Sequence, residues 1–186
     1  MKLAYAFCGS FCTHAKSINI LKQLVQKHDV TPILSEASRD TDTRFGRADT
    51  LQKNIVGICG KEPILSIRSA EEQITRGDFD AVIVSPCTGN TLAKIANGIT
   101  DSTVTMCVKA QLRCRKPVLI ALATNDALGA NLQNIALTVE KKNIYFVPFG
   151  QDAPKEKPTS LVCNFDLLEN ALENAVKGVQ VQPLLL

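Results

Sequence analysis

The stretch "DAVIVSPCTGNTLAKIANGITDS", residues 80–102, contains a strand, a loop and a helix in direct succession. Residues 80–85 are an almost continuous apolar run, which is typical of a strand buried on both faces of a parallel sheet. From residue 90 the spacing changes, because Leu92, Ile95, Ala96 and Ile99 fall on one face of a helix. The residues between, 86–91, are Pro, Gly, Asn and small polar or thiol side chains. This loop is longer than a tight strand–helix turn requires, which indicates a binding role.

The same alternation of strand and helix continues on both sides of this unit. Strands of the same apolar kind are predicted at 3–8, 30–35, 117–122 and 143–148, with a possible sixth strand at 62–67. Segments of helical period separate them, at 13–28, 47–57, 69–76, 103–114 and 130–141. Strands that alternate with helices predict an α/β fold, here a three-layer Rossmann-like domain with a parallel sheet of about six strands. We expect residues 1–186 to form one domain.

The last predicted helix has the clearest end signals. Asp166 stands where an N-cap is expected, Glu169 follows three positions later, and Gly178 is a typical stop. Leu168, Leu172, Ala175 and Val176 are predicted to form its buried face. Before this helix lies a loop rich in Pro and Lys, residues 148–160.

Composition excludes several classes of function. The net charge is only +3, aromatic residues make up 5%, and no basic block occurs, so nucleic-acid binding is not expected. No segment approaches the ~20 apolar residues of a membrane-spanning helix. Neither the seven cysteines nor the two histidines have the spacing of a metal site. Cysteines scattered among apolar residues indicate buried thiols in a reducing cytoplasm, rather than disulfides.

Two loops carry ligand-binding chemistry at the carboxyl ends of strands, where α/β sheets bind ligands. In "CGSFCTH", residues 8–14, Gly9 allows close backbone approach, and Ser10 and Thr13 offer hydroxyls. Thr13 could also cap the next helix, whose N-terminus favours an anion. The loop at 86–91 offers the same chemistry, so the two loops together could hold a phosphate and a flat heterocycle. Small residues are also common at any strand–helix turn, and neither loop is a dinucleotide fingerprint or a P-loop.

The run from Pro86 to Asp101, "PCTGNTLAKIANGITD", resembles the flavin-binding signature of the homo-oligomeric flavoproteins, which include cysteine decarboxylases and flavin prenyltransferases. The resemblance extends over essentially the whole chain. It implies a homo-oligomer that binds FMN. The cofactor-binding residues that it implies are Gly9, Ser10, Ser35, Thr88, Gly89, Asn90 and Thr91, with Thr13 beside them.

The chain departs from the decarboxylases of this family at two places. It has no His after His28, where they use one in acid–base work, and "ATNDALG" at 123–129 replaces their Pro-x-Met-Asn segment. Arg44 stands in the stretch that replaces the His segment, and a guanidinium binds carboxylates well. Thr124 and Asn125 follow a strand at its ligand-binding end. We therefore expect Arg44, Thr124 and Asn125 to contact a small dicarboxylate substrate, although a solvated arginine and a plain turn explain them equally well.

Further segments, "DTDTRFG", "RKPVLIALATNDALGANLQNI" and "KNIYFVPFGQDAPKEKPTSLV", resemble one branch of this family. Its members are one half of a two-subunit oxidising enzyme, which implies a second subunit that binds NAD(P). Two alternatives stay open. One is a stand-alone FMN-dependent decarboxylase, and the other is a non-catalytic subunit that binds an anion or flavin. The sequence identifies no catalytic residue.

Overall fold

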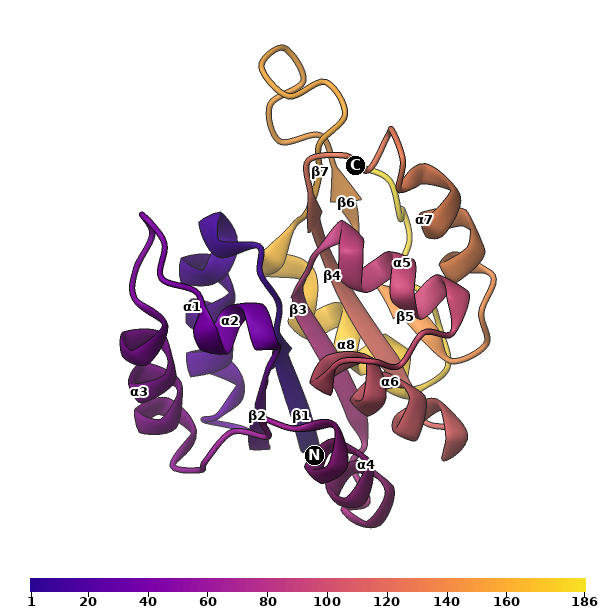
Figure 1. Ribbon diagram of the computed structural model, residues 1–186. Coiled ribbons are helices and arrows are strands. Elements are labelled where there is room, and N and C mark those ends of the chain that lie inside the picture. Colours follow the sequence, from indigo (N-terminus) through magenta and orange to yellow (C-terminus); the bar gives the residue numbers. More distant parts are fainter.

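A computed structural model describes residues 1–186 and shows a central sheet covered by helices on both faces (Figure 1). The strands are β1 Lys2–Phe7, β2 Asp29–Leu34, β3 Ala81–Cys87, β4 Val118–Thr124, β5 Ile144–Phe146, β6 Phe149–Gly150 and β7 Leu161–Cys163. The α-helices are α1 His14–Leu24, α2 Glu36–Asp40, α3 Ala48–Cys59, α4 Ile67–Arg76, α5 Gly89–Asn97, α6 Thr103–Arg113, α7 Leu132–Val139 and α8 Leu168–Val176. Two short 3-10 helices, η1 Phe11–Thr13 and η2 Phe165–Leu167, precede α1 and α8.

Five strands form a parallel sheet in the order β2-β1-β3-β4-β5. Strands β1, β3 and β4 are buried almost from end to end, as their continuous apolar runs predict. In Figure 1, α5 and α6 lie in front of the sheet and α8 lies behind it. The predicted α/β Rossmann-like class is therefore confirmed.

The remaining strands differ from the prediction of about six parallel strands. Residues 62–67 form only an isolated parallel bridge, between Ile33 and Ile64. The sheet is extended instead by the short antiparallel strands β6 and β7. The last two residues of β4, Ala123 and Thr124, pair with Val162 and Leu161 of β7. The sequence does not show this pairing because two- and three-residue strands have no detectable periodicity.

The start of the last helix also differs from the prediction. Asn164, not Asp166, provides the cap. It is the N-cap of η2, and its side chain accepts a hydrogen bond from the N–H of Asp166. The buried face of α8 contains Leu168, Ala171, Leu172 and Ala175, whereas Val176 is 42% exposed.

The residues after α8 return to the sheet edge. Phe149 N–H donates to Leu184 O at 3.0 Å, and Leu186 N–H donates to Phe149 O at 3.0 Å, so the C-terminal segment pairs with β6. The loop between β6 and β7 projects beyond the sheet at the top of Figure 1. Among the helices, none has the length and apolar character needed to cross a membrane.

Candidate functional site

The two loops that the sequence singles out lie next to each other at the carboxyl edge of the sheet. Strands β1 and β3 are neighbours, with Ala6 opposite Val84, and the chain order reverses between them because β2 lies on the other side of β1. Such a reversal separates the loops that follow the two strands and opens a crevice between them. Loop 8–13 follows β1. The loop predicted at 86–91 is shorter than expected, because β3 extends to Cys87 and α5 begins at Gly89. Thr88 and the first turn of α5 therefore border the crevice on the β3 side.

A buried network fixes the base of the crevice. The hydroxyl of Tyr5 on β1 lies 2.9 Å from both Ser17 Oγ on α1 and Ser85 Oγ on β3. Ser17 Oγ also donates to Ser85 O at 2.7 Å. These three side chains have no solvent exposure. The network therefore joins β1, α1 and β3 three residues before Thr88, the N-cap of α5.

Two cavities open on either side of loop 8–13. The first, which we call the helix-end cavity, has a volume of about 370 Å³. It is lined by Gly9, Phe11, Ser35, Glu36, Ala37, Thr88, Asn90, Thr91, Lys94 and Ser102. The second, the hairpin cavity, has a volume of about 310 Å³. It is lined by Gly9, Ser10, Phe11, Cys12, Thr13, Phe45, Thr88, Ala123, Thr124, Asn125, Asp152, Lys157 and Val162. The cavities share Gly9, Phe11 and Thr88, so they adjoin.

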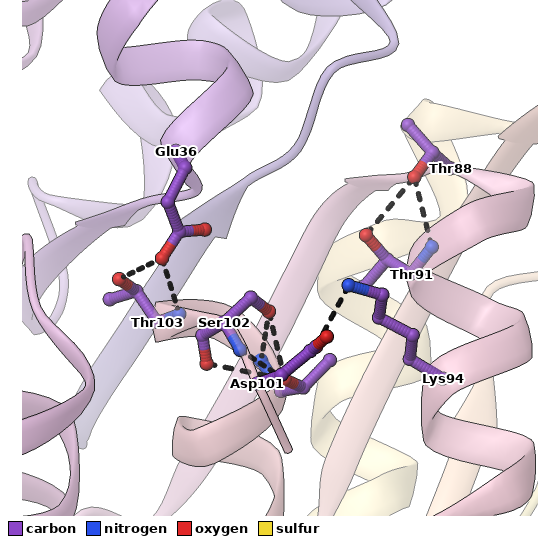
Figure 2. A network of polar contacts seen from close by, with 8 residues as sticks. Glu36, Thr88, Thr91, Lys94, Asp101, Ser102 and Thr103 are labelled. Carbon is purple, nitrogen blue, oxygen red and sulfur yellow. Dashed lines mark hydrogen bonds and ion pairs between the residues drawn. The ribbon is translucent and has the colours of Figure 1, made fainter. Parts of the chain in front are cut away.

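The helix-end cavity is lined by the N-caps of α5 and α6, Thr88 and Ser102, which Figure 2 labels. Thr88 is the N-cap of α5, and its Oγ1 accepts from the N–H of Thr91 at 3.2 Å. Ser102 caps α6 in a reciprocal pair with Thr105, with hydrogen bonds of 3.2 and 3.1 Å. The N–H groups of Gly89 and Asn90, the first of α5, have no acceptor within the helix. The cavity therefore has the positive end of two helix dipoles at its wall.

Charged side chains at this cavity are partly paired (Figure 2). Lys94 Nζ lies 2.8 Å from Asp101 Oδ1, and its side chain is 25% exposed. Glu36 Oε1 accepts hydrogen bonds from the N–H and the hydroxyl of Thr103, at 2.9 Å each. Lys94 and Asp101 belong to the signature stretch 86–101, whereas nothing in the sequence predicts the contact of Glu36 with α6.

Several predicted residues already serve local structure. Ser35 is buried and caps α2 by accepting from the N–H of Ser38 at 3.2 Å. Thr13 makes no capping hydrogen bond to α1, contrary to the expectation, and instead its hydroxyl donates to Ser10 O at 2.9 Å. Asn90 is exposed at the rim of the helix-end cavity, and Thr91 is buried in its wall.

Gly89 lines neither cavity. A Cβ atom at this position would contact Asn131 Nδ2 and would lie 2.7 Å from Thr124 Oγ1 and 2.8 Å from Asp126 Oδ1. These three side chains form a cluster in which Asp126 accepts hydrogen bonds from Thr124, at 2.5 Å, and from Asn131, at 2.8 Å. A glycine is therefore required here for the close approach of α5 to the segment after β4.

The three predicted substrate residues do not all lie at the same cavity. Thr124 and Asn125 line the hairpin cavity, as their place at the end of β4 predicts. Arg44 lines neither cavity, and its guanidinium lies over the ring of Phe45 with 4.9 Å between Cζ and the ring centroid. Lys157 also lines the hairpin cavity, and sequence reasoning missed it. The only signal was its place in the Pro- and Lys-rich loop.

The cysteines near the site are of two kinds. Burial raises the pKa of the Cys8 thiol to about 11, and burial also raises the pKa of Cys87. These thiols stay protonated near neutral pH, which fits the predicted packing role. Cys12 is exposed beside the hairpin cavity.

Burial lowers the pKa of His14, whose Nε2 lies 2.7 Å from Cys8 O.

Comparison with known proteins identifies the family of the chain. Residues 1–175 match the model of the flavoprotein family. The chain is 38% identical over 185 residues to the B subunit of dipicolinate synthase from Bacillus subtilis (strain 168), covering 99% of this chain and 92% of that protein. It is 39% identical to the B subunit of dipicolinate synthase from Bacillus halodurans C, whose crystal structure superimposes with a TM-score of 0.90. That match covers 100% of this chain and 95% of the other.

A more distant structure shares the fold. DmrB of Burkholderia xenovorans, solved in complex with FMN, is 17% identical and has a TM-score of 0.70, over 95% of each chain. The resemblance drawn from the stretch 86–101 is thus confirmed over nearly the full length. The chain belongs to the flavoprotein family.

Proposed function

We propose that this chain is the flavin-binding subunit of a two-subunit dipicolinate synthase. In that reaction dihydrodipicolinate loses a hydride and a proton and becomes the aromatic dipicolinate, pyridine-2,6-dicarboxylate. The observation that carries the proposal is the likeness to two B subunits of dipicolinate synthase over 99% and 100% of the chain. The two adjoining cavities at the β1–β3 crevice support it.

The helix-end cavity fits the phosphate of FMN. The N-termini of α5 and α6 and the ammonium of Lys94 favour an anion there, and Gly9 adds no side chain to the wall. The negative charge of Glu36 repels an anion, but one of its carboxylate oxygens already accepts two hydrogen bonds from Thr103. Ser10, Ser35, Thr88, Asn90 and Thr91 are the residues of this chain that we expect around the cofactor.

The hairpin cavity adjoins the proposed phosphate position, and its volume of about 310 Å³ suits a small planar acid. Bound FMN would supply a hydride acceptor. Asn125 and Ser10 offer hydrogen-bond donors to a carboxylate, and Phe11 and Phe45 provide apolar walls. Thr124 is less available, because its hydroxyl donates to Asp126. Arg44, predicted from the sequence as a substrate contact, lies outside this cavity and stacks on Phe45.

The proposal includes assembly. A synthase of two different subunits requires a partner for this chain, the A subunit of dipicolinate synthase, which we expect to bind NAD(P). Family resemblance suggests that this chain also associates with copies of itself. As an oxidoreductase of dipicolinate formation, the complex would work in the cytoplasm of the mother cell of a sporulating bacterium.

A second candidate is a non-catalytic subunit that binds flavin or a free anion and stabilises the partner. Two observations favour it. The hydroxyls of Ser35, Thr88 and Ser102 already accept hydrogen bonds from helix N–H groups. No His lines either cavity. The third candidate, a stand-alone FMN-dependent decarboxylase, is disfavoured because the acid–base His of those enzymes is missing.

The visible absorption spectrum of the purified chain, after incubation with FMN and dialysis, tests the proposal. We expect a retained flavin spectrum that Ser10→Ala and Asn90→Ala weaken. Asn97→Ala, at the opposite end of α5 and outside both cavities, is the matched control and should retain flavin like the wild type. Reduction of the bound flavin by dihydrodipicolinate would then place the chemistry in this chain. A chain that never retains flavin would contradict the proposal and favour the non-catalytic candidate.

A further inference from the structure

The loop between β6 and β7 is held in place at one side of the hairpin cavity. Thr159 Oγ1 donates to Asn125 O at 2.6 Å, and Leu128 N–H donates to Thr159 O at 2.9 Å. Within the loop, Lys157 N–H donates to Ala153 O at 2.7 Å. These contacts tie the loop to the segment after β4. The side chain of Lys157 is therefore presented to the cavity by an anchored backbone.

Lys157 and Asp152 are the only charged side chains that line the hairpin cavity. Lys157 Nζ lies 3.3 Å from Asp152 Oδ2, and the other carboxylate oxygen accepts from Ser160 Oγ at 2.7 Å. Burial acts to raise the pKa of Asp152, but the hydrogen bonds from Ser160 and Lys157 outweigh it and hold the pKa below its ordinary value. The pair is partly exposed, with 48% of the Lys157 side chain and 31% of the Asp152 side chain in solvent. Such an ion pair is weak, so another carboxylate can replace Asp152 at little cost.

The neutral groups of the same cavity also offer donors. Ser10 Oγ lies 3.2 Å from Thr13 Oγ1, whose proton is directed to Ser10 O, and this long contact leaves the Ser10 hydroxyl able to donate to a ligand. The side-chain amide NH₂ of Asn125 donates no hydrogen bond within the chain, and its Oδ1 lies 3.5 Å from Ser160 Oγ, whose proton is directed to Asp152. The cavity thus combines one ammonium with two free neutral donors. This set is suited to a small anion with two acceptor groups.

We propose that Lys157 binds one carboxylate of the dicarboxylate substrate, and that Asp152 is the counter-ion which this carboxylate displaces. The second carboxylate would lie at the donors of Ser10 and Asn125. This assignment rests on the proposed function, which supplies the substrate class. It gives to Lys157 the role that the sequence suggests for Arg44, because Arg44 stacks on Phe45 outside the cavity.

Calorimetric titration of the full chain with dipicolinate, in metal-free buffer, tests the proposal. We expect Lys157→Gln to raise the dissociation constant of dipicolinate about tenfold, since a charge-assisted contact is lost. Lys155→Gln is the matched control, because Lys155 lies in the same loop, is exposed and forms no ion pair. It should bind like the wild type. Asp152→Asn should bind more tightly, because no carboxylate then competes for Lys157.

Two further comparisons make the outcome decisive. Pyridine-2-carboxylate, which has one carboxylate, should bind more weakly than dipicolinate and should be less sensitive to Lys157→Gln. Equal losses for Lys157→Gln and Lys155→Gln, or a larger loss for Arg44→Ala, would overturn the assignment while leaving the proposed function intact. A wild-type chain that binds FMN but no dipicolinate would contradict both.

Discussion

Glu36 and Thr103 are 67 positions apart in the chain, and two hydrogen bonds of 2.9 Å join them (Figure 2). The carboxylate at the start of α2 thereby accepts the first N–H of α6 and the hydroxyl of a fully buried threonine. This contact holds two helix N-termini against the same cavity. It also places a negative charge where we propose that a phosphate binds.

Glu36→Ala should destabilise the fold, because it leaves the N–H and the hydroxyl of Thr103 without an acceptor. We expect a loss of about 1–3 kcal/mol in the free energy of unfolding, measured by urea denaturation. Glu36→Gln is the matched control, since its amide oxygen can still accept both bonds, and it should cost less. The Gln variant should also bind FMN more tightly, because the negative charge is removed. Weaker binding of FMN by Glu36→Gln would argue against a phosphate in the helix-end cavity.

Gly89→Ala should destabilise the chain by about 1–3 kcal/mol, because the new methyl group would overlap the polar cluster of Thr124, Asp126 and Asn131. The control is Gly57→Ala within α3, where an added Cβ meets no atom within 4 Å. That change should stabilise the protein by about 0.5–1 kcal/mol, as expected for Gly to Ala in a helix. Thermal unfolding of the two variants checks the contrast, and similar shifts in both would refute the close approach at residue 89.

Tyr5→Phe should cost about 1–2 kcal/mol, since it removes the hydroxyl that bonds Ser17 and Ser85 in a site without water access. Because Ser85 lies three residues before Thr88, which lines both cavities, flavin retention should fall as well. Tyr145→Phe is the control, since the hydroxyl of Tyr145 forms no hydrogen bond within the chain. Urea denaturation and the flavin spectrum of both variants give the test. Unchanged stability in Tyr5→Phe would show that the network contributes little.

Stability should fall in alkaline solution because of the buried thiol of Cys8, whose pKa is raised to about 11. As the pH rises above about 8.5, the thiol of the unfolded chain ionises first, which favours unfolding. The contribution of Cys8 is therefore complete below about pH 8.5 and is lost as the pH rises toward 11. Urea denaturation of the wild type and of Cys8→Ala across this range should show a shallower decline for the variant. If the free energy of unfolding falls equally with pH in the wild type and in Cys8→Ala, the buried Cys8 thiol is not the cause of the alkaline loss of stability.

Much of the fold was predictable from local pattern. The parallel strands lie where the apolar runs predict them, because a strand covered on both faces must be apolar at successive positions. The stretch 86–101 likewise indicated the carboxyl edge of the sheet at which the two cavities open, since its hydroxyls and glycines stand at a strand end. The errors concern features with little local signal, namely the bridge at Ile64, the cap at Asn164 and the short strands β6 and β7.

By itself, the sequence determined the α/β class, the family and the two segments that border the candidate site, because periodicity and a continuous motif are local properties. The tertiary structure decided which distant side chains meet there. It placed Lys157 rather than Arg44 in the hairpin cavity, set Glu36 against α6, and made Gly89 a packing requirement. The physical reason is that β4 pairs with β7, and α2 meets α6, only once the sheet has formed. Contacts between residues so far apart in the chain follow from packing and not from the pattern of either segment.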